Sequence, residues 1–255
     1  MAKQTMQEKL NALLESHRTA IRVKCRMQLP LAGGLPATEN GLRYFVKRHM
    51  GIPEDSDEFE SVLEKVQEEI GARDTTSEEG ELSTEHIYSL NVIRRSQHGP
   101  YVMEHMLKAL LKQAASRIGV FQKNRGSKGD LAEMGSVLAI EDSLQNPDRP
   151  WEVYLRNGVG AAKTHFDIVQ GCPSGPKGKK SIQTHTEVTD EGTRFAFELR
   201  FGKGKITKDL AMHIIAASTQ IGLGSCLSLP YGKFIVEDLE FVGKESSDTD
   251  EEDDA

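Results

Sequence analysis

The sequence lacks the features that mark several large classes of protein. No run of about 18 apolar residues occurs, so no membrane-spanning helix is expected. Residues 1–18 are polar and amphipathic, without the apolar stretch typical of a signal peptide. Cys25, Cys172 and Cys226 are an odd number of cysteines without CxxC spacing, which implies neither a disulfide framework nor a zinc knuckle. We therefore expect a cytoplasmic protein without membrane contact, with its cysteines as small buried side chains.

Histidine and aromatic residues are too scattered or too few to define a site. The eight histidines form no HxxxH or HExxH pair, so we expect no metal and no cofactor. Aromatic residues make up 6% of the chain, too little for a base-stacking platform, and Tyr154, Tyr231 and Phe234 are more typical of core positions. His165 and His185 flank a lysine-rich stretch, where a general acid and base could cleave RNA. A metal-independent ribonuclease that uses either histidine is therefore one alternative.

The net charge of −7 conceals an uneven distribution. Residues 244–255 hold seven acidic residues and one lysine, and residues 54–85 hold thirteen acidic and two basic residues. The rest of the chain has 29 basic and 19 acidic residues, a net charge of +10. A basic body with separate acidic segments is typical of a protein that binds a polyanion, with the acidic segments as competitors. The alternative is that both acidic segments are solubilising surface.

The first half of the chain predicts one strand followed by helices. Residues 4–18 have leucines at helical spacing, which predicts a first helix. Residues 21–29 alternate apolar side chains with largely basic ones, which predicts a strand with one basic face. Thr38 is a suitable N-cap for a helix that ends at His49. Further helices are predicted over residues 54–71, which are acidic, and over residues 100–118, with Pro100 in the first turn.

The second half predicts strands and one more helix. Strands are predicted within residues 135–142, 151–155 and 192–202, with a loop-rich stretch to Gly178. Thr207 caps a predicted helix, and residues 233–243 form the last strand, which needs a bulge if Phe241 and Val236 share a face.

This order predicts an α+β protein, an elaborated ferredoxin-like (RRM-like) domain with a helical insertion at about residues 38–118. We expect residues 1–243 to form that domain and residues 244–255 to form a disordered acidic tail.

Three glycine-containing stretches carry clustered cations. Lysines on such loops neutralise phosphates without reading bases, and a helix N-terminus also favours an anion. We therefore predict binding of single-stranded nucleic acid, DNA or RNA, by these loops together with the basic face of the first strand. The loop residues are Lys123, Arg125 and Lys128; Lys177, Lys179 and Lys180; and Lys203 and Lys205.

A glycine-rich stretch joins the last predicted helix to the last strand, with Gly222, Gly224, Ser228, Tyr231, Gly232 and Phe234 in order. This order resembles the glycine-rich signature of the RAMP superfamily, RRM-like proteins that form guide-RNA-binding subunits of CRISPR effector complexes. The resemblance implies an RRM-like fold and nucleic-acid contacts by this loop, including Lys233, and it supplies no catalytic residue. Leu229 and Pro230 stand where the family carries a basic residue or another glycine, so we expect the lysine loops to hold the phosphates first.

Two further resemblances concern most of the chain and its C-terminus. Residues 20–242 are similar to uncharacterised bacteriophage proteins that combine a GGLP-like turn, a GPK-like loop and a GLG loop. The acidic C-terminus resembles the tails of single-stranded DNA-binding proteins, which compete with nucleic acid and recruit partners. We therefore expect a non-enzymatic, phage-encoded nucleic-acid-binding protein of the host cytoplasm, whose tail competes with nucleic acid or recruits protein partners. The alternative is a structural or assembly protein of a multi-subunit complex, which would form a homo-oligomer.

Overall fold

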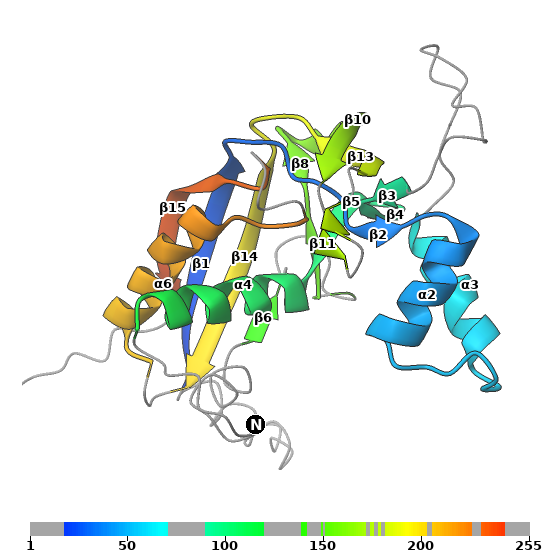
Figure 1. Ribbon diagram of the computed structural model, residues 1–255. Helices are drawn as coiled ribbons and strands as arrows, with labels where there is room; N and C mark the ends of the chain where they lie inside the picture. Colours follow the sequence, from blue (N-terminus) through cyan, green and yellow to red (C-terminus); the bar gives the residue numbers. More distant parts are fainter. Residues whose placement is uncertain are drawn as a thin grey trace, which may run out of the picture.

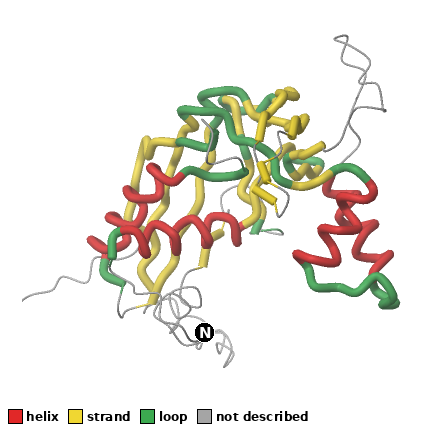
Figure 2. Tube along the Cα trace, viewed as in Figure 1, coloured by secondary structure: helices red, strands yellow, loops and turns green. Residues whose placement is uncertain are grey.

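The computed structural model describes residues 18–70, 90–119, 139–141, 149, 151–171, 174–175, 178–179, 182–202, 206–225 and 231–242 (Figures 1 and 2). The fold is of mixed α+β class. Its described helices are α2 (Glu39–His49), α3 (Phe59–Ile70), α4 (Glu104–Arg117) and α6 (Lys208–Ile221). No helix in these residues is long and apolar enough to cross a membrane. The strands are β1 (Arg18–Met27), β2 (Leu35–Pro36), β3 (Leu90–Val92), β4 (Arg94–Ser96), β5 (Gly99–Met103), β6 (Ala139–Glu141), β7 (Glu152–Tyr154), β8 (Arg156–Asn157), β9 (Gly160–Ala161), β10 (Thr164–Gly171), β11 (Ser174–Gly175), β12 (Gly178–Lys179), β13 (Ile182–Thr189), β14 (Arg194–Gly202) and β15 (Phe234–Val242).

Strand β1 lies between β14 and β15 in the central sheet and is antiparallel to both. Strands β6 and β8 both pair with β14. Ile21, Val23, Cys25 and Met27 alternate along one face of β1, and each is at most 1% exposed. The predicted strand and the buried Cys25 are therefore confirmed, while Cys172 and Cys226 lie outside the described residues.

The last strand, β15, contains the bulge that its sequence requires. Val236 is opposite Cys25 and Asp238 is opposite the adjacent residue Lys24. Two steps along β15 therefore match one step along β1, and Glu237 is the extra residue. The bulge returns the following apolar side chains to the core face. Phe241, opposite Ile21, is therefore on the same face as Val236, as predicted.

Helices α4 and α6 lie side by side across one face of the central sheet (Figure 1). Phe195 and Phe201 of β14, Leu111 of α4 and Ile215 of α6 belong to the same buried core. Burial of each such side chain contributes about 1.5–3 kcal/mol. Thr207 caps α6 as predicted, because its Oγ1 accepts a hydrogen bond from the backbone N–H of Leu210 at 3.2 Å.

Helices α2 and α3 form a hairpin at the opposite end of the molecule from α6 (Figure 1). Val46 of α2 and Phe59 and Leu63 of α3 belong to a second buried core of their own. Thr38 caps α2 as predicted, since its Oγ1 accepts from the N–H of Gly41 at 3.2 Å. Helix α3 begins later than predicted, at Phe59, because residues 53–58 form turns.

The prediction that Pro100 starts a helix is wrong. Pro100 lies in β5 opposite Arg95 of β4, and its carbonyl accepts a hydrogen bond from Leu155 N at 2.9 Å. A proline lacks only the N–H donor, so it is compatible with a short strand whose carbonyl is used. Helix α4 begins at Glu104 instead.

The stretch before Gly178, predicted to be loop-rich, contains the long strand β10, which pairs with β13 along eight residues. Strand β13 also pairs in parallel with β3, and β2 follows at the edge of this second sheet. Polar residues dominate both long strands, and few apolar side chains such as Val188 mark the buried face. Backbone pairing therefore defines this hairpin more than hydrophobic alternation does. The helix predicted over residues 4–18 lies outside the described residues, except for Arg18 in β1.

Candidate nucleic-acid interface

The basic side chains of β1 project from the sheet face opposite the one that packs against α4 and α6, and acidic partners on neighbouring strands neutralise them. Arg22 Nε lies 3.1 Å from Oε2 of Glu198 on β14. Lys24 Nζ lies 2.7 Å from Oδ2 of Asp238, and Arg26 Nε lies 2.7 Å from Oε1 of Glu237, both on β15. The basic face predicted for this strand is therefore a ladder of opposite charges rather than a free cationic surface.

These ion pairs also shift the ionisation of their members. The hydrogen bond to Asp238 raises the pKa of Lys24, and the same contact lowers the pKa of Asp238. Hydrogen bonds from Arg194 and Arg26 lower the pKa of Glu237. Because both signs of charge persist at neutral pH, a polyanion approaching this face meets carboxylates as well as cations.

The glycine-rich loop after α6 is held against the segment that follows β1. Gly222, Gly224 and Gly232 have φ angles of 95°, 93° and 74°. The N–H of Ser225 donates to the carbonyl of Ala32 at 3.1 Å. A Cβ on Gly224 would lie 2.9 Å from that same oxygen. Glycine is therefore required here for close contact within the chain.

Lys233 and Tyr231 have partners within the chain as well. Lys233 Nζ donates to the carbonyls of Gln220 and Ile221 and so satisfies the C-terminal end of α6. The hydroxyl of Tyr231 donates to Oδ2 of Asp167 on β10 at 2.6 Å. Ser228, predicted with them, lies outside the described residues.

The predicted cationic loops also lie outside the described residues, except that Lys179 belongs to β12, where only its backbone is described. The structure does place the strand ends to which these loops attach. Gly202 of β14 is opposite Arg18, Val242 of β15 is opposite Ala20, and Ala139 of β6 is opposite Arg200. Segments 120–138 and 203–205, and the acidic residues after Val242, therefore all attach at one end of the central sheet. Lys177, Lys179 and Lys180 instead fall in the sequence between β10 and β13 of the second sheet, and β12, which contains Lys179, pairs with β11 in a separate two-stranded sheet.

His165 and His185 do not form a general acid–base pair. His165 is opposite Val188 and His185 is opposite Ile168, three positions along the same ladder. Side chains an odd number of positions apart project from opposite faces of a sheet. His165 instead places Nδ1 3.3 Å from Oδ1 of Asp190. Cleavage by one histidine alone stays a prediction.

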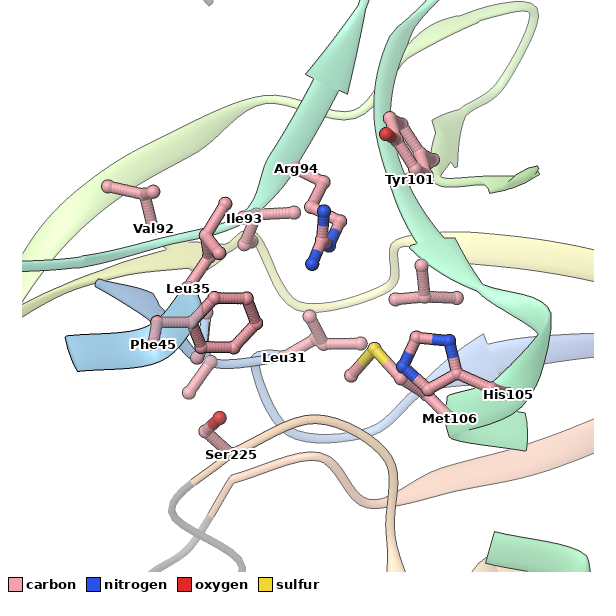
Figure 3. Close-up of a pocket in the computed structure, with 14 residues that line it drawn as sticks. Leu31, Leu35, Phe45, Val92, Ile93, Arg94, Tyr101, His105, Met106 and Ser225 are labelled. Atoms are coloured by element: carbon pink, nitrogen blue, oxygen red, sulfur yellow. The ribbon is translucent and has the colours of Figure 1, made fainter. Parts of the chain in front are cut away.

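A cavity of about 200 Å³ lies where the α2–α3 hairpin meets the first turn of α4 and the loop after α6 (Figure 3). Its polar lining includes Arg94, Tyr101, His105 and Ser225. The Arg94 side chain is 15% exposed and forms an ion pair with Glu69 of α3. Burial lowers the pKa of Arg94, and burial together with the charge of Arg94 lowers the pKa of His105.

Sequence analysis missed this site, although the pattern that marks it is visible. Two consecutive arginines, Arg94 and Arg95, follow an apolar run directly. On a strand, neighbours point to opposite sides, so one arginine must face inward. Arg94 lines the cavity, and Arg95 pairs with buried Glu187.

Comparisons with known proteins give structural likenesses only. No family model matches the chain, and no curated protein sequence matches it. The chain is similar to one in the cryo-EM structure of the Type III-B Cmr-beta bound to cognate target RNA, with 13% identity and a TM-score of 0.43 over 92% of this chain. It spans 65% of the length of that chain. It is also similar to Cmr6 from Pyrococcus furiosus, with 11% identity and a TM-score of 0.42, over 86% of this chain and 98% of Cmr6.

Proposed function

We propose that this chain is a non-enzymatic nucleic-acid-binding protein that binds single-stranded DNA or RNA through cationic loops on a ferredoxin-like (RRM-like) core. The elements β1, α4, β6, β14, α6 and β15 support that core, because they follow one another in the strand–helix–strand–strand–helix–strand order of the fold, with β7 to β13 between β6 and β14. The segment from β2 to β5 is then inserted between β1 and α4. In this proposal residues 1–243 are the domain and residues 244–255 its tail. A phage origin belongs to the proposal on sequence resemblance alone.

Two cationic segments and the acidic tail attach at the same end of the central sheet, and this observation carries the proposal. Gly202 and Val242 are on the two strands that flank β1, next to Arg18 and Ala20 respectively. Adjacent strands are about 4.8 Å apart, so these two strand ends are separated by about 10 Å. A tail tethered there has a high effective concentration at the neighbouring cations, which are Lys123, Arg125, Lys128, Lys203 and Lys205. The tail therefore competes with nucleic acid for them.

The glycine-rich loop has a secondary place in this interface. Its described members, Gly222, Gly224, Tyr231, Gly232 and Lys233, lie beside the proposed core and make contacts within the chain. Ser228 belongs to the same proposed loop by sequence. The lysines at 177, 179 and 180, in the segment between β10 and β13, offer a second contact point.

Salt-dependent binding to labelled single-stranded DNA and RNA tests the proposal. One variant replaces the five cations at 123, 125, 128, 203 and 205 by alanine. The slope of log K against log salt should then become less negative by about 0.7–0.9 for each lost phosphate contact. The matched control replaces Lys47 and Arg48, exposed on α2, by alanine. A chain ending at residue 243 should bind more tightly than the full chain. Absence of binding at low salt by both forms would contradict the proposal, and equal affinity of the two would remove the competing role of the tail.

A second candidate function, assembly of a multi-subunit complex, is favoured by the exposed edge of the second sheet. Strand β10 is at that edge, with Phe166 38% and Ile168 54% exposed. Edge strands offer unpaired backbone groups for pairing with another chain. If this edge assembles copies of the chain, light scattering will show oligomers without nucleic acid, and Ile168→Lys will dissociate them. A monomer at all concentrations would exclude this self-assembly.

A further inference from the structure

The cavity beside Arg94 has the size and the walls for one small ring system. Its volume is about 200 Å³. That is larger than the cavity of about 150 Å³ that holds a benzene ring, and smaller than the roughly 300 Å³ at which sites for drug-sized ligands begin. Leu31 and Leu35, Phe45 of α2 and Met106 of α4 supply apolar walls. An aromatic ring and a thioether are favourable neighbours for a flat ring.

The guanidinium of Arg94 offers hydrogen-bond donors to this cavity. Its Cζ lies 6.0 Å from the centre of the Phe45 ring, and Figure 3 shows its nitrogens directed into the cavity between Phe45 and His105. Glu69 pairs with Nη1, and the described residues provide no other acceptor for the remaining N–H groups. A buried guanidinium with five donors is stabilised when more of them are paired.

The other polar groups both donate and accept. Burial and the charge of Arg94 lower the pKa of His105, which favours the neutral imidazole with its one donor and one acceptor. The Ser225 hydroxyl offers the same two functions and has no hydrogen-bond partner among the described residues. A simple anion would leave the apolar walls unused and compete with Glu69, and an apolar ring would offer no acceptor to the Arg94 N–H groups that Glu69 does not pair. A flat ring with donors and acceptors along its edge satisfies both parts of the cavity.

We propose that this cavity binds one unstacked nucleobase of a single strand, with Phe45 and Met106 against the ring and Arg94, His105 and Ser225 along its edge. This inference rests on the proposed nucleic-acid binding. Nucleobases present donors and acceptors around a flat ring, and recognition of single strands commonly uses unstacked bases. Lys108 and Lys112 follow His105 at helical spacing on the same side of α4. Lys108 Nζ pairs with Oε1 of Glu104 at 3.1 Å, so Lys112 is the cation offered to the phosphates beside the bound base.

Oligonucleotides containing one fluorescent 2-aminopurine test the site, and the free 2-aminopurine riboside tests it independently of the strand. Ser225→Leu fills the cavity without a change of charge. The double variant Arg94→Met, Glu69→Gln removes the donors and the paired charge together. Each should reduce affinity for the oligonucleotide about 5- to 150-fold, the effect of one stacked base, and abolish the fluorescence change. Arg48→Ala, on the exposed side of α2, controls for loss of one cation, and thermal unfolding controls for folding.

The outcomes separate this inference from the proposed function. Oligonucleotide binding that is equal in the wild type and in both folded variants would overturn the base site and leave the proposed function standing. If no oligonucleotide binds, saturation-transfer NMR with the riboside decides. A signal from the wild type that is lost in Ser225→Leu would support a ring site without strand binding, and no signal from the wild type would overturn it.

Discussion

Arg95 and Glu187, 92 residues apart in the sequence, form an ion pair with an Nη2–Oε1 distance of 2.6 Å. The Glu187 side chain is 3% exposed and also accepts hydrogen bonds from Ile93 N at 2.8 Å and Thr164 Oγ1 at 2.7 Å. One carboxylate therefore joins β4, β10 and β13, which belong to two different sheets. The cost of removing it includes every donor that it leaves unpaired.

Replacement of this carboxylate should strongly destabilise the fold. Glu187→Ala is expected to lower the free energy of unfolding by about 3 kcal/mol, because it breaks a buried, hydrogen-bonded charge pair. Glu187→Gln keeps an acceptor and should lose about half as much. Urea unfolding measures both, with Glu64→Ala on the exposed side of α3 as a control expected within about 0.5 kcal/mol of the wild type. A wild-type midpoint for Glu187→Ala would contradict this structural role.

Alanine substitutions at two glycines with positive φ should separate two causes of lost stability, backbone strain and steric contact. Gly51 has a φ of 74° and open space around its Cα, whereas a Cβ on Gly224 would meet the Ala32 carbonyl at 2.9 Å. Gly51→Ala should lose about 1 kcal/mol of stability from the left-handed conformation alone. Gly224→Ala should lose about 3 kcal/mol, because overpacking adds to that strain. Equal losses in thermal unfolding would show that the close approach of the two loops contributes nothing.

The buried Tyr101 should make stability fall at alkaline pH. Burial raises its pKa from 10.0 to about 12. Above pH 10 the unfolded chain releases this proton while the folded chain keeps it, so stability decreases as pH rises from 10 to about 12. Tyr101→Phe should flatten that decrease in urea unfolding measured against pH. Tyr44→Phe, at a side chain that is 60% exposed, should leave the pH profile of stability unchanged. If Tyr101→Phe gives the same profile as Tyr44→Phe, the prediction is wrong.

Lys233 should act on stability more than on nucleic-acid binding. Its ammonium donates to the last carbonyls of α6, where a cation contributes about 1 kcal/mol. Lys233→Met is therefore expected to lose about that amount in chemical unfolding while the salt dependence of oligonucleotide binding stays the same. A phosphate contact would instead lower the slope of log K against log salt by about 1, and that result would assign Lys233 to the interface.

Local patterns predicted the elements whose determinants lie close together in the sequence. Thr38 and Thr207 cap helices through hydrogen bonds to residues three positions away. The alternation of Ile21, Val23 and Cys25 fixed a buried strand face, and the apolar spacing around Val236 required a bulge. Each of these depends on side-chain spacing and on one backbone conformation. The α+β class was predictable for the same reason.

Tertiary structure decided whatever depends on partners far away in the chain. The sequence presents Arg22, Lys24 and Arg26 as a basic face, but their acidic partners are 176, 214 and 211 residues distant. The cavity beside Arg94 forms only when α2, α4 and the loop after α6 meet. The sequence by itself therefore determined which elements form and which of their sides is apolar, because those depend on local backbone preference and periodicity. Only the fold decided which charges are neutralised and where a cavity opens, because Coulombic pairing and packing act between neighbours in space.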